Sequence, residues 1–241
     1  MEIEILTKRF CDYLQFIKGY TPDTIKRYKT TINYFSKVAN VSSIDQVSDD
    51  NVRNFFYFGR THKNWNPNSF ITYHKSLLVF FRWCEKEGFI KHNPVDDIET
   101  PKSPKKLPPK LTKQEAMRIL EVVYNYPYKY HYLRSRNHAI FSTFILAGLR
   151  KKELLNLKYT DVDLVNSSIM VYQGKGCKDR IIPICAKLRD SLERYIPERK
   201  RLNKTCPEFF TSLNRNSQFT NTGLKRLVTA IKEASGIKFT I

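Results

Sequence analysis

The sequence predicts a mainly α-helical protein with one small β-hairpin or sheet (an α+β fold), divided into two domains. In the first hundred residues, apolar positions recur at spacings of three and four, which is the pattern of amphipathic helices. Residues 100–110, TPKSPKKLPPK, lack this periodicity and read as an extended linker. After Ser167 the pattern changes to short β-rich runs around a glycine-containing turn. We therefore expect a helical domain at 1–99, a linker at 100–110 and a second domain at 111–241.

Four helices are predicted in the first domain. One covers about residues 3–17, the second begins at Pro22 with Thr21 as its N-cap, the third opens after Ser48, and the fourth runs over about 67–87 and ends at Gly88. The apolar face of the second helix is formed by Ile25, Tyr28, Ile32 and Phe35. The core positions expected in the fourth are Phe70, Leu77, Leu78, Phe81 and Trp83.

The outer faces of two of these helices, and the linker, carry residues that could contact DNA. The second helix presents Lys26, Arg27 and Lys29. The fourth presents Asn68, Ser69, Thr72 and Lys75, and the linker contributes Lys105 and Lys106. Such side chains suit phosphates and base edges, although solvent-facing helix surfaces carry the same residue types.

The second domain opens with a predicted capping box, in which Thr112 and Glu115 satisfy each other's backbone donors. After an aromatic loop at 124–132, a strongly apolar helix starts near Asn137 and stops at Gly148, and a short helix covers about 150–157. An acidic turn at 161–163 leads to a hairpin with strands at 169–172 and 181–184. Two further helices are expected at about 186–200 and 222–234.

The charge balance indicates a polyanionic partner. Lys and Arg total 42 against 23 Asp and Glu, which gives a net charge of +19 spread along the chain. The basic residues lie beside aromatic residues within helical patterns, which favours nucleic acid over a membrane surface. No apolar run approaches the roughly 18 residues that span a bilayer, and the start has no signal-peptide pattern. We expect a cytoplasmic, nucleoid-associated protein that binds duplex DNA and has no membrane contact.

The cysteines predict neither a disulfide framework nor a metal site. Their number is odd, they lie far apart and no CxxC pair occurs, so we expect five reduced thiols, no metal and no cofactor. They are Cys11, Cys84, Cys177, Cys185 and Cys206.

Two motifs in the second domain carry the functional prediction. AGLRKKELLNL contains Arg150 and Glu153, and GKGCKDRIIPI contains Lys175, Lys178 and Arg180. Taken alone, Arg150 could simply pair with Glu153 one turn later. The two motifs in this order resemble the catalytic domain of the tyrosine recombinase (phage integrase) family, especially its Xer-like and transposon-integrase branches. The preceding helices are similar to the SAM-like core-binding domain of that family, so the resemblance spans essentially the whole chain.

The resemblance implies a role for each residue of the motifs. Arg150 matches the first catalytic arginine, which grips the scissile phosphate and stabilises the charge of its transition state. Lys175 matches the lysine that protonates the departing 5′ oxygen, with Lys178 as its nearest competitor. Glu153 resembles a structural support for Arg150, and Lys178 and Arg180 resemble phosphate contacts.

The sequence also departs from the family pattern. An H-x-x-R motif and a nucleophilic tyrosine should follow Arg150, and neither occurs in the 241 residues; His131 stands three residues before Arg134 but precedes Arg150. The resemblance thus implies a recombinase lacking its C-terminal end, which binds DNA without cleaving it and is a monomer where the full-length protein is a tetramer on two DNA sites.

Two other interpretations remain open. A non-catalytic DNA-binding or regulatory protein could keep the recombinase architecture, and a stop codon directly after Ile241 would favour it. An RNA-binding or generic basic helical protein would require both motifs to be coincidental. The target sequence and the direction of recombination are not predicted.

Overall fold

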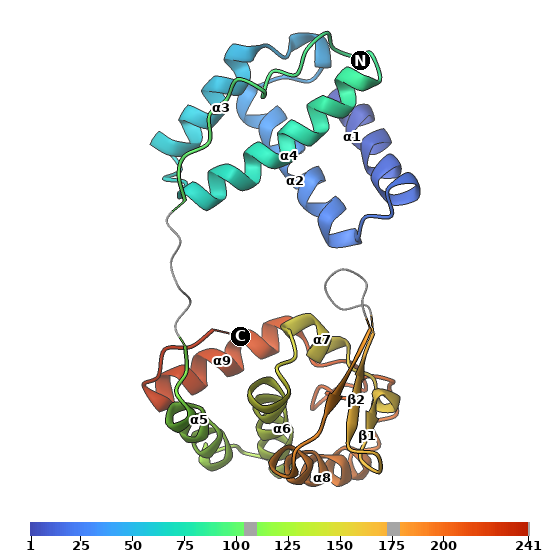
Figure 1. Cartoon of the computed structure of the whole chain (residues 1–241), viewed down its shortest axis with the longest axis vertical. Coiled ribbons are helices and arrows are strands. Elements are labelled where there is room, and N and C mark those ends of the chain that lie inside the picture. The colour runs from blue at the N-terminus through green and yellow to red at the C-terminus, as the bar shows by residue number, and fades with distance from the viewer. Residues whose placement is uncertain (104–109, 173–178, 241) are drawn as a thin grey trace. The chain divides into compact units, whose positions relative to one another are not determined.

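The computed structural model describes residues 1–103, 110–172 and 179–240, and the chain divides into two compact units, Met1–Lys106 and Leu107–Ile241 (Figure 1). Helices dominate both units. Three short strands lie in the second, so the predicted fold class, mainly α with a small sheet, is confirmed.

The N-terminal unit contains the four predicted helices, and the first of them changes to a π-helical turn over its last residues. Their bounds, with one π-helical turn (η1) and one 3₁₀ turn (η2), are α1 Ile3–Asp12, η1 Tyr13–Ile17, α2 Pro22–Ala39, η2 Ile44–Gln46, α3 Asp49–Thr61 and α4 Pro67–Lys86. Ser48 and Asn66 accept the backbone N–H of Asn51 and Ser69 respectively. Thr21 stands at the predicted N-cap, but its hydroxyl pairs with that of Thr24 at 3.0 Å.

An aromatic cluster fills the core of this unit. Phe35 packs edge-on against Phe55 and Phe81, with ring centroids 5.4 and 5.7 Å apart. The prediction for α4 was wrong at one position, because Phe80 is fully buried while Leu78 is only partly so. Counted from the buried Leu77, Phe80 falls on the same helix face at i+3, whereas Leu78 is rotated away.

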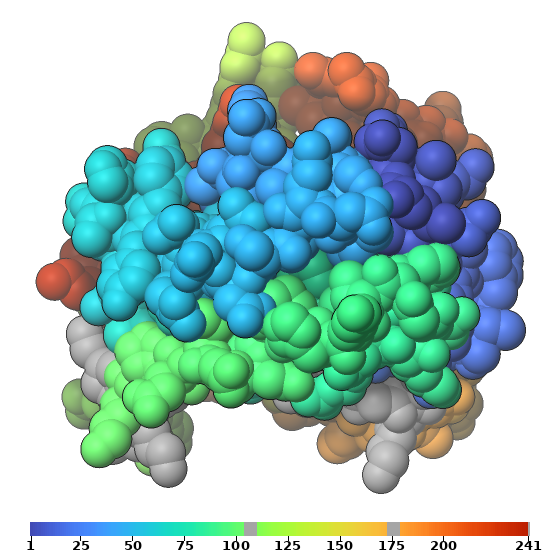
Figure 2. Space-filling model, turned by 90° about the horizontal axis from the view of Figure 1, so that it is seen from above, coloured from blue at the N-terminus to red at the C-terminus, as the bar shows by residue number. Residues whose placement is uncertain are grey.

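The segment after α4 packs back onto that helix. The Nε2 of His74, a buried side chain, lies 2.9 Å from the carbonyl oxygen of Ile98, and Asn93 donates its side-chain amide to the carbonyl of Leu78 at 3.3 Å. Ser103 donates to the Oδ1 of Asn68 at 2.6 Å. In Figure 2 this segment, in light green, runs across the visible face of the unit.

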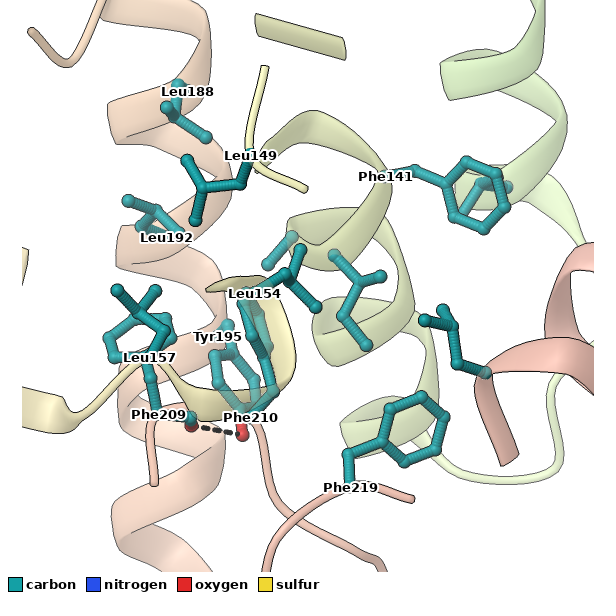
Figure 3. Close-up of a cluster of buried hydrophobic side chains, with 14 of the residues drawn as sticks. Phe141, Leu149, Leu154, Leu157, Leu188, Leu192, Tyr195, Phe209, Phe210 and Phe219 are labelled. Atoms are coloured by element: carbon teal, nitrogen blue, oxygen red, sulfur yellow. Dashed lines mark hydrogen bonds between the residues drawn. The ribbon is translucent and has the colours of Figure 1, made fainter. Parts of the chain in front are cut away.

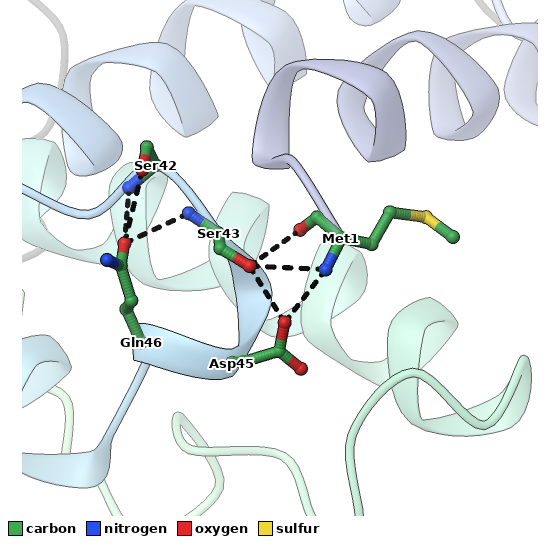
Figure 4. A network of polar contacts seen from close by, with 5 residues as sticks. All are labelled: Met1, Ser42, Ser43, Asp45 and Gln46. Atoms are coloured by element: carbon green, nitrogen blue, oxygen red, sulfur yellow. Dashed lines mark hydrogen bonds and ion pairs between the residues drawn. The ribbon is translucent and has the colours of Figure 1, made fainter.

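A polar network fixes the first residue to η2 (Figure 4). The ammonium group of Met1 lies 2.8 Å from Asp45 and 3.1 Å from the Ser43 hydroxyl. These contacts, the ammonium first, lower the pKa of the Asp45 carboxyl. The Oε1 of Gln46 accepts the backbone N–H groups of Ser42 and Ser43, which closes the turn.

The C-terminal unit builds its core around α6, which packs against α5 and α8. The bounds of its elements are α5 Lys113–Asn125, α6 His131–Ala147, α7 Lys151–Asn156, η3 Tyr159–Asp161, β1 Val162–Asp163, β2 Ser168–Val171, β3 Arg180–Pro183, α8 Ala186–Arg201 and α9 Asn221–Ser235. The strands pair antiparallel in the order β1-β2-β3, with Ile169 opposite Ile182. Figure 3 shows Tyr195, Phe209 and Phe210 packed together below Leu154.

Two predictions for this unit were wrong in detail. Helix α6 begins at His131, six residues before the predicted start, because its polar-looking first turns bury Tyr132 and Arg136. Part of the expected acidic turn forms β1, since Val162 and Asp163 pair with Ile169 and Ser168. The capping box of Thr112 and Glu115 is confirmed, as are α7, the hairpin strands, α8 and α9 within one or two residues.

Buried cations hold the irregular stretch between α8 and α9. Arg136 donates to the carbonyl of Thr211 at 3.0 Å, and Arg199 donates to that of Glu208 at 3.2 Å. Lys204 reaches the carbonyls of Leu213 and Arg215 at 2.7 and 2.9 Å. Because buried charge needs hydrogen-bond partners, these contacts fix the path of the backbone there.

Gly59 on α3 provides a test of packing in the N-terminal unit. A Cβ added there would lie 2.2 Å from the ring of Trp65, which stacks on Tyr73 with ring centroids 4.1 Å apart. We expect Gly59→Ala to destabilise this unit by about 1–3 kcal/mol, because overpacking outweighs the gain in helix propensity.

Denaturant unfolding followed by tryptophan fluorescence measures this effect in one unit, since Trp65 and Trp83 are the only tryptophans of the chain. Tyr57→Ala, which removes an exposed side chain from the same helix, is the control and should change little. Equal stability of Gly59→Ala and the wild type would contradict the packing described.

Candidate functional site

Arg150 stands where α6 has ended and α7 begins. Gly148 ends α6 with a φ of 63°, Leu149 is buried, and Arg150 takes an extended conformation as the N-cap residue of α7. Its side chain is 58% exposed. The apolar residue before it and the helix after it therefore fix the backbone while the guanidinium reaches the surface.

Glu153 connects Arg150 to the sheet. Its Oε2 accepts the backbone N–H of Arg150 at 2.8 Å, and its Oε1 accepts the Nη1 of the Arg150 guanidinium at 2.8 Å. Arg180, the first residue of β3, donates its Nη1 to Oε1 at 2.9 Å and its Nη2 to Oε2 at 2.7 Å. We call these three residues the Arg–Glu–Arg cluster.

The electrostatics of the cluster follow from these contacts. Hydrogen bonds from Arg180 and then Arg150 lower the pKa of the Glu153 carboxyl to about 2, against a burial that raises it. The Glu153 side chain is only 8% exposed, so its charge is compensated by hydrogen bonds rather than by water. Two guanidinium groups and one carboxylate leave the cluster with a net positive charge.

Arg150 is among the residues that line a cavity of about 480 Å³. Apolar side chains from α6 and from the segment after α9 line much of it, among them Phe141, Phe144 and Phe239.

The two lysines of the second motif, Lys175 and Lys178, lie outside the described residues, as do the linker residues Lys105 and Lys106. On either side of the lysine loop the strands are paired, with Val171 opposite Arg180. The described strand ends on either side of residues 173–178 therefore lie opposite each other, and one of them, Arg180, belongs to the Arg–Glu–Arg cluster.

The predicted contact residues of the N-terminal unit lie on two different helices. Lys26, Arg27 and Lys29 are all exposed on α2, and the Arg27 guanidinium lies 5.2 Å from the centre of the Tyr28 ring.

On α4, the predicted contact residues are partly occupied by local hydrogen bonds. Asn68 and Thr72 are exposed, but the Oδ1 of Asn68 accepts from Ser103, and Thr72 donates its hydroxyl to the Asn68 carbonyl at 2.8 Å. Ser69 is half-buried, and Lys75 is exposed.

Sequence reasoning missed the pairing of Arg180 with Glu153. The spacing of three residues indicated the contact between Arg150 and Glu153, but Arg180 lies 27 residues from Glu153 along the chain. Only the register of the sheet brings the start of β3 to α7.

Within the described residues, no group of three or more potential metal-ligating side chains (His, Cys, Asp, Glu) lies close enough together to hold a metal ion. None of the helices in the same parts of the chain combines the length and the apolar character needed to cross a bilayer. Four of the five cysteines belong to the described part and are free thiols.

The geometry defines a site with one exposed guanidinium, that of Arg150, fixed by a carboxylate that a second arginine neutralises. Comparison with known proteins then gives the family. Residues 109–241 match the family model described as phage integrase family, and residues 6–89 match that of the phage integrase N-terminal SAM-like domain. The chain belongs to the phage integrase family of tyrosine recombinases.

Relatives agree with this membership, and solved structures share the fold. The chain is 31% identical to tyrosine recombinase XerD of Listeria innocua, over 94% of this chain and 78% of the relative, and 28% identical to XerC of Oceanobacillus iheyensis, over 98% and 78%. It shares the fold of a lambda integrase dimer bound to a COC′ core site (TM-score 0.71, 19% identity, 99% of this chain and 83% of that one). It also shares the fold of XerH bound to a difH substrate in a post-cleavage complex (TM-score 0.70, 21% identity, 98% and 68%).

The depressed pKa of Glu153 predicts how acid affects stability. A carboxyl whose pKa is lower in the folded chain than in the unfolded chain stabilises the fold above the unfolded value of about 4.5, and this contribution is lost as pH falls toward about 2. For a side chain as buried as Glu153 it amounts to roughly 3 kcal/mol at neutral pH.

We therefore expect Glu153→Gln to lower the stability at pH 7 and to flatten its decline between pH 4.5 and about 2. Unfolding followed by circular dichroism across this range measures both effects. Glu121→Gln, which removes an exposed carboxylate of α5, controls for the loss of one charge. The prediction fails if the wild type and Glu153→Gln lose stability in parallel on acidification.

Proposed function

We propose that this chain binds duplex DNA as the core-binding domain and partial catalytic domain of a site-specific recombinase. The observation that carries the proposal is the exposed Arg150 guanidinium, held by the little-exposed Glu153 carboxylate that Arg180 also binds. The net charge of +19 supports a polyanionic ligand. The similar lambda integrase and XerH structures were solved with DNA sites.

The proposed roles follow the family motifs. Arg150 grips the scissile phosphate, where its planar fork stabilises charge developing on the phosphorus-bound oxygens. Lys175 protonates the leaving 5′ oxygen, and Glu153 supports Arg150. The proposed further contacts to phosphates or base edges are Lys26, Arg27, Lys29, Asn68, Ser69, Thr72, Lys75, Lys105, Lys106 and Lys178.

The proposed division of labour assigns residues 1–99 to DNA binding, 100–110 to the linker and 111–241 to the catalytic domain. In the full-length protein a tyrosine attacks phosphorus, expels the 5′ oxygen and forms a 3′-phosphotyrosyl bond, which conserves the energy for rejoining. We propose a tetramer on two DNA sites for that protein, in line with the similar lambda integrase tetramer bound to a Holliday junction. The 241 residues alone are proposed to be monomeric.

Binding to duplex DNA across a salt series tests the central proposal. If six or more phosphates are neutralised, affinity should fall on the order of a thousandfold or more between 50 and 200 mM salt. Arg150→Ala should weaken binding, and the slope of the logarithm of affinity against the logarithm of salt concentration should become shallower by about one. Lys200→Ala, which removes an exposed lysine of α8 outside the proposed contacts, should leave the slope unchanged. Absent or salt-insensitive binding would contradict duplex recognition.

A suicide DNA substrate tests the chemistry. We expect these 241 residues to form no covalent protein–DNA adduct, because none of their 14 tyrosines follows an H-x-x-R motif placed after Arg150. Denaturing gel electrophoresis detects the adduct. Formation of the adduct would show that one of these tyrosines is a nucleophile. If the gene ends directly after Ile241 and the protein binds DNA without forming an adduct, the regulatory interpretation is favoured.

A further inference from the structure

The Glu153 carboxylate has an acceptor pattern that constrains what Arg150 can do. Both oxygens are shared: each accepts one N–H from Arg180, and each accepts one from Arg150, of which only one comes from the guanidinium. Arg180 therefore holds the two-pronged contact, and Arg150 holds a single-pronged one. Within the described part of the chain, that is the one hydrogen bond of the Arg150 guanidinium.

Arg150, which makes the single hydrogen bond, is also the more exposed of the two arginines. The Arg150 side chain is 58% exposed, while that of Arg180 is 34% exposed and turned toward a carboxylate that is 8% exposed. A fork-to-carboxylate contact is directional and strong, so both terminal nitrogens of Arg180 are committed to Glu153. Arg180 still has its Nε–H and one further N–H on each terminal nitrogen, but Arg150 is the more exposed of the two and has only one guanidinium N–H engaged, so Arg150 is the better placed to offer donors to a ligand.

Removing Arg180 would change the partner of Glu153. A carboxylate with so little solvent keeps its charge only if donors replace the lost hydrogen bonds. Arg150 already contacts Oε1 and has further N–H groups that can take the place of the lost donors. Arg150 would then close a two-pronged pair with Glu153, and the pair would be neutral where the cluster was positive.

We propose that Arg180 is a positioning residue, which neutralises Glu153 so that the charge and the free N–H donors of Arg150 remain available to a DNA phosphate. This inference rests on the proposed duplex binding and replaces the direct phosphate contact predicted for Arg180 from the sequence. It also couples the two motifs, because Arg180, the first residue of β3, carries the counter-charge for Glu153 on α7.

Second-site rescue tests the proposal. Arg180→Met should weaken duplex binding about tenfold, the scale of one charge-assisted hydrogen bond. Adding Glu153→Gln removes the competing carboxylate and should restore affinity to within about threefold of the wild type. Adding Glu121→Gln restores the same net charge at a different place and should not rescue. In an Arg150→Ala background, Arg180→Met should have no further effect.

Three results would contradict the proposed role of Arg180 or the proposed function. If Arg180→Met binds like the wild type, or stays weak with Glu153→Gln, Arg180 has no role or contacts phosphate itself, and the proposal is overturned. If Glu121→Gln restores affinity as well as Glu153→Gln does, the loss of affinity in Arg180→Met follows from net charge alone, and the proposal is overturned. Failure of the wild-type chain to bind duplex DNA would instead overturn the proposed function.

Thermal unfolding checks that each variant is folded. If Arg180→Met does not fold, Arg180→Lys retains the counter-charge without the fork and should keep binding within about threefold of the wild type. A tenfold loss in a folded Arg180→Lys protein would overturn the proposal.

Discussion

The arrangement of the site depends on one buried carboxylate that is shared by two arginines. Glu153 binds the backbone at the start of α7, the side chain of Arg150 and the first residue of β3 at the same time. Without it, the helix start and the sheet would lose the link between them, and two guanidinium groups would face each other without compensation. Loss of either arginine would leave the Glu153 carboxylate, whose side chain is 8% exposed, with fewer hydrogen bonds, and breaking one side of such a contact commonly costs several kcal/mol.

The sequence predicted the parts of the fold that obey local rules. Helix periodicity, caps such as Ser48 and the Thr112–Glu115 pair, and the stop at Gly148 depend on neighbours within a few residues. The misassigned core position, Leu78 in place of Phe80, arose from choosing between adjacent apolar residues whose orientation depends on packing against other helices. The early start of α6 was missed because Arg136 looks polar, although its stem and fork are buried against Phe219 and Thr211.

In the candidate site, too, the local contacts could be predicted from the sequence and the long-range contacts could not. The pairing of Arg150 with Glu153 was predictable from a spacing of three residues, and the family resemblance named both motifs. The contact with Arg180 requires the antiparallel register that sets Val171 opposite Arg180, and register follows from side-chain burial across a whole sheet. On α4, the prediction of a polar contact face could not include Ser103, which reaches Asn68 only because the segment after α4 folds back over the helix.

The buried cations between α8 and α9 have a consequence for how this region can vary. Arg136, Arg199 and Lys204 are bound there by main-chain carbonyl oxygens, which every amino acid supplies. Exposed side chains along the stretch can therefore be replaced with little loss of stability, whereas replacement of any of the three basic residues would remove hydrogen bonds that hold the backbone. Among related sequences, we expect the exposed residues of this stretch to vary while the three basic residues are conserved. The backbone path would then be kept even where the sequence differs.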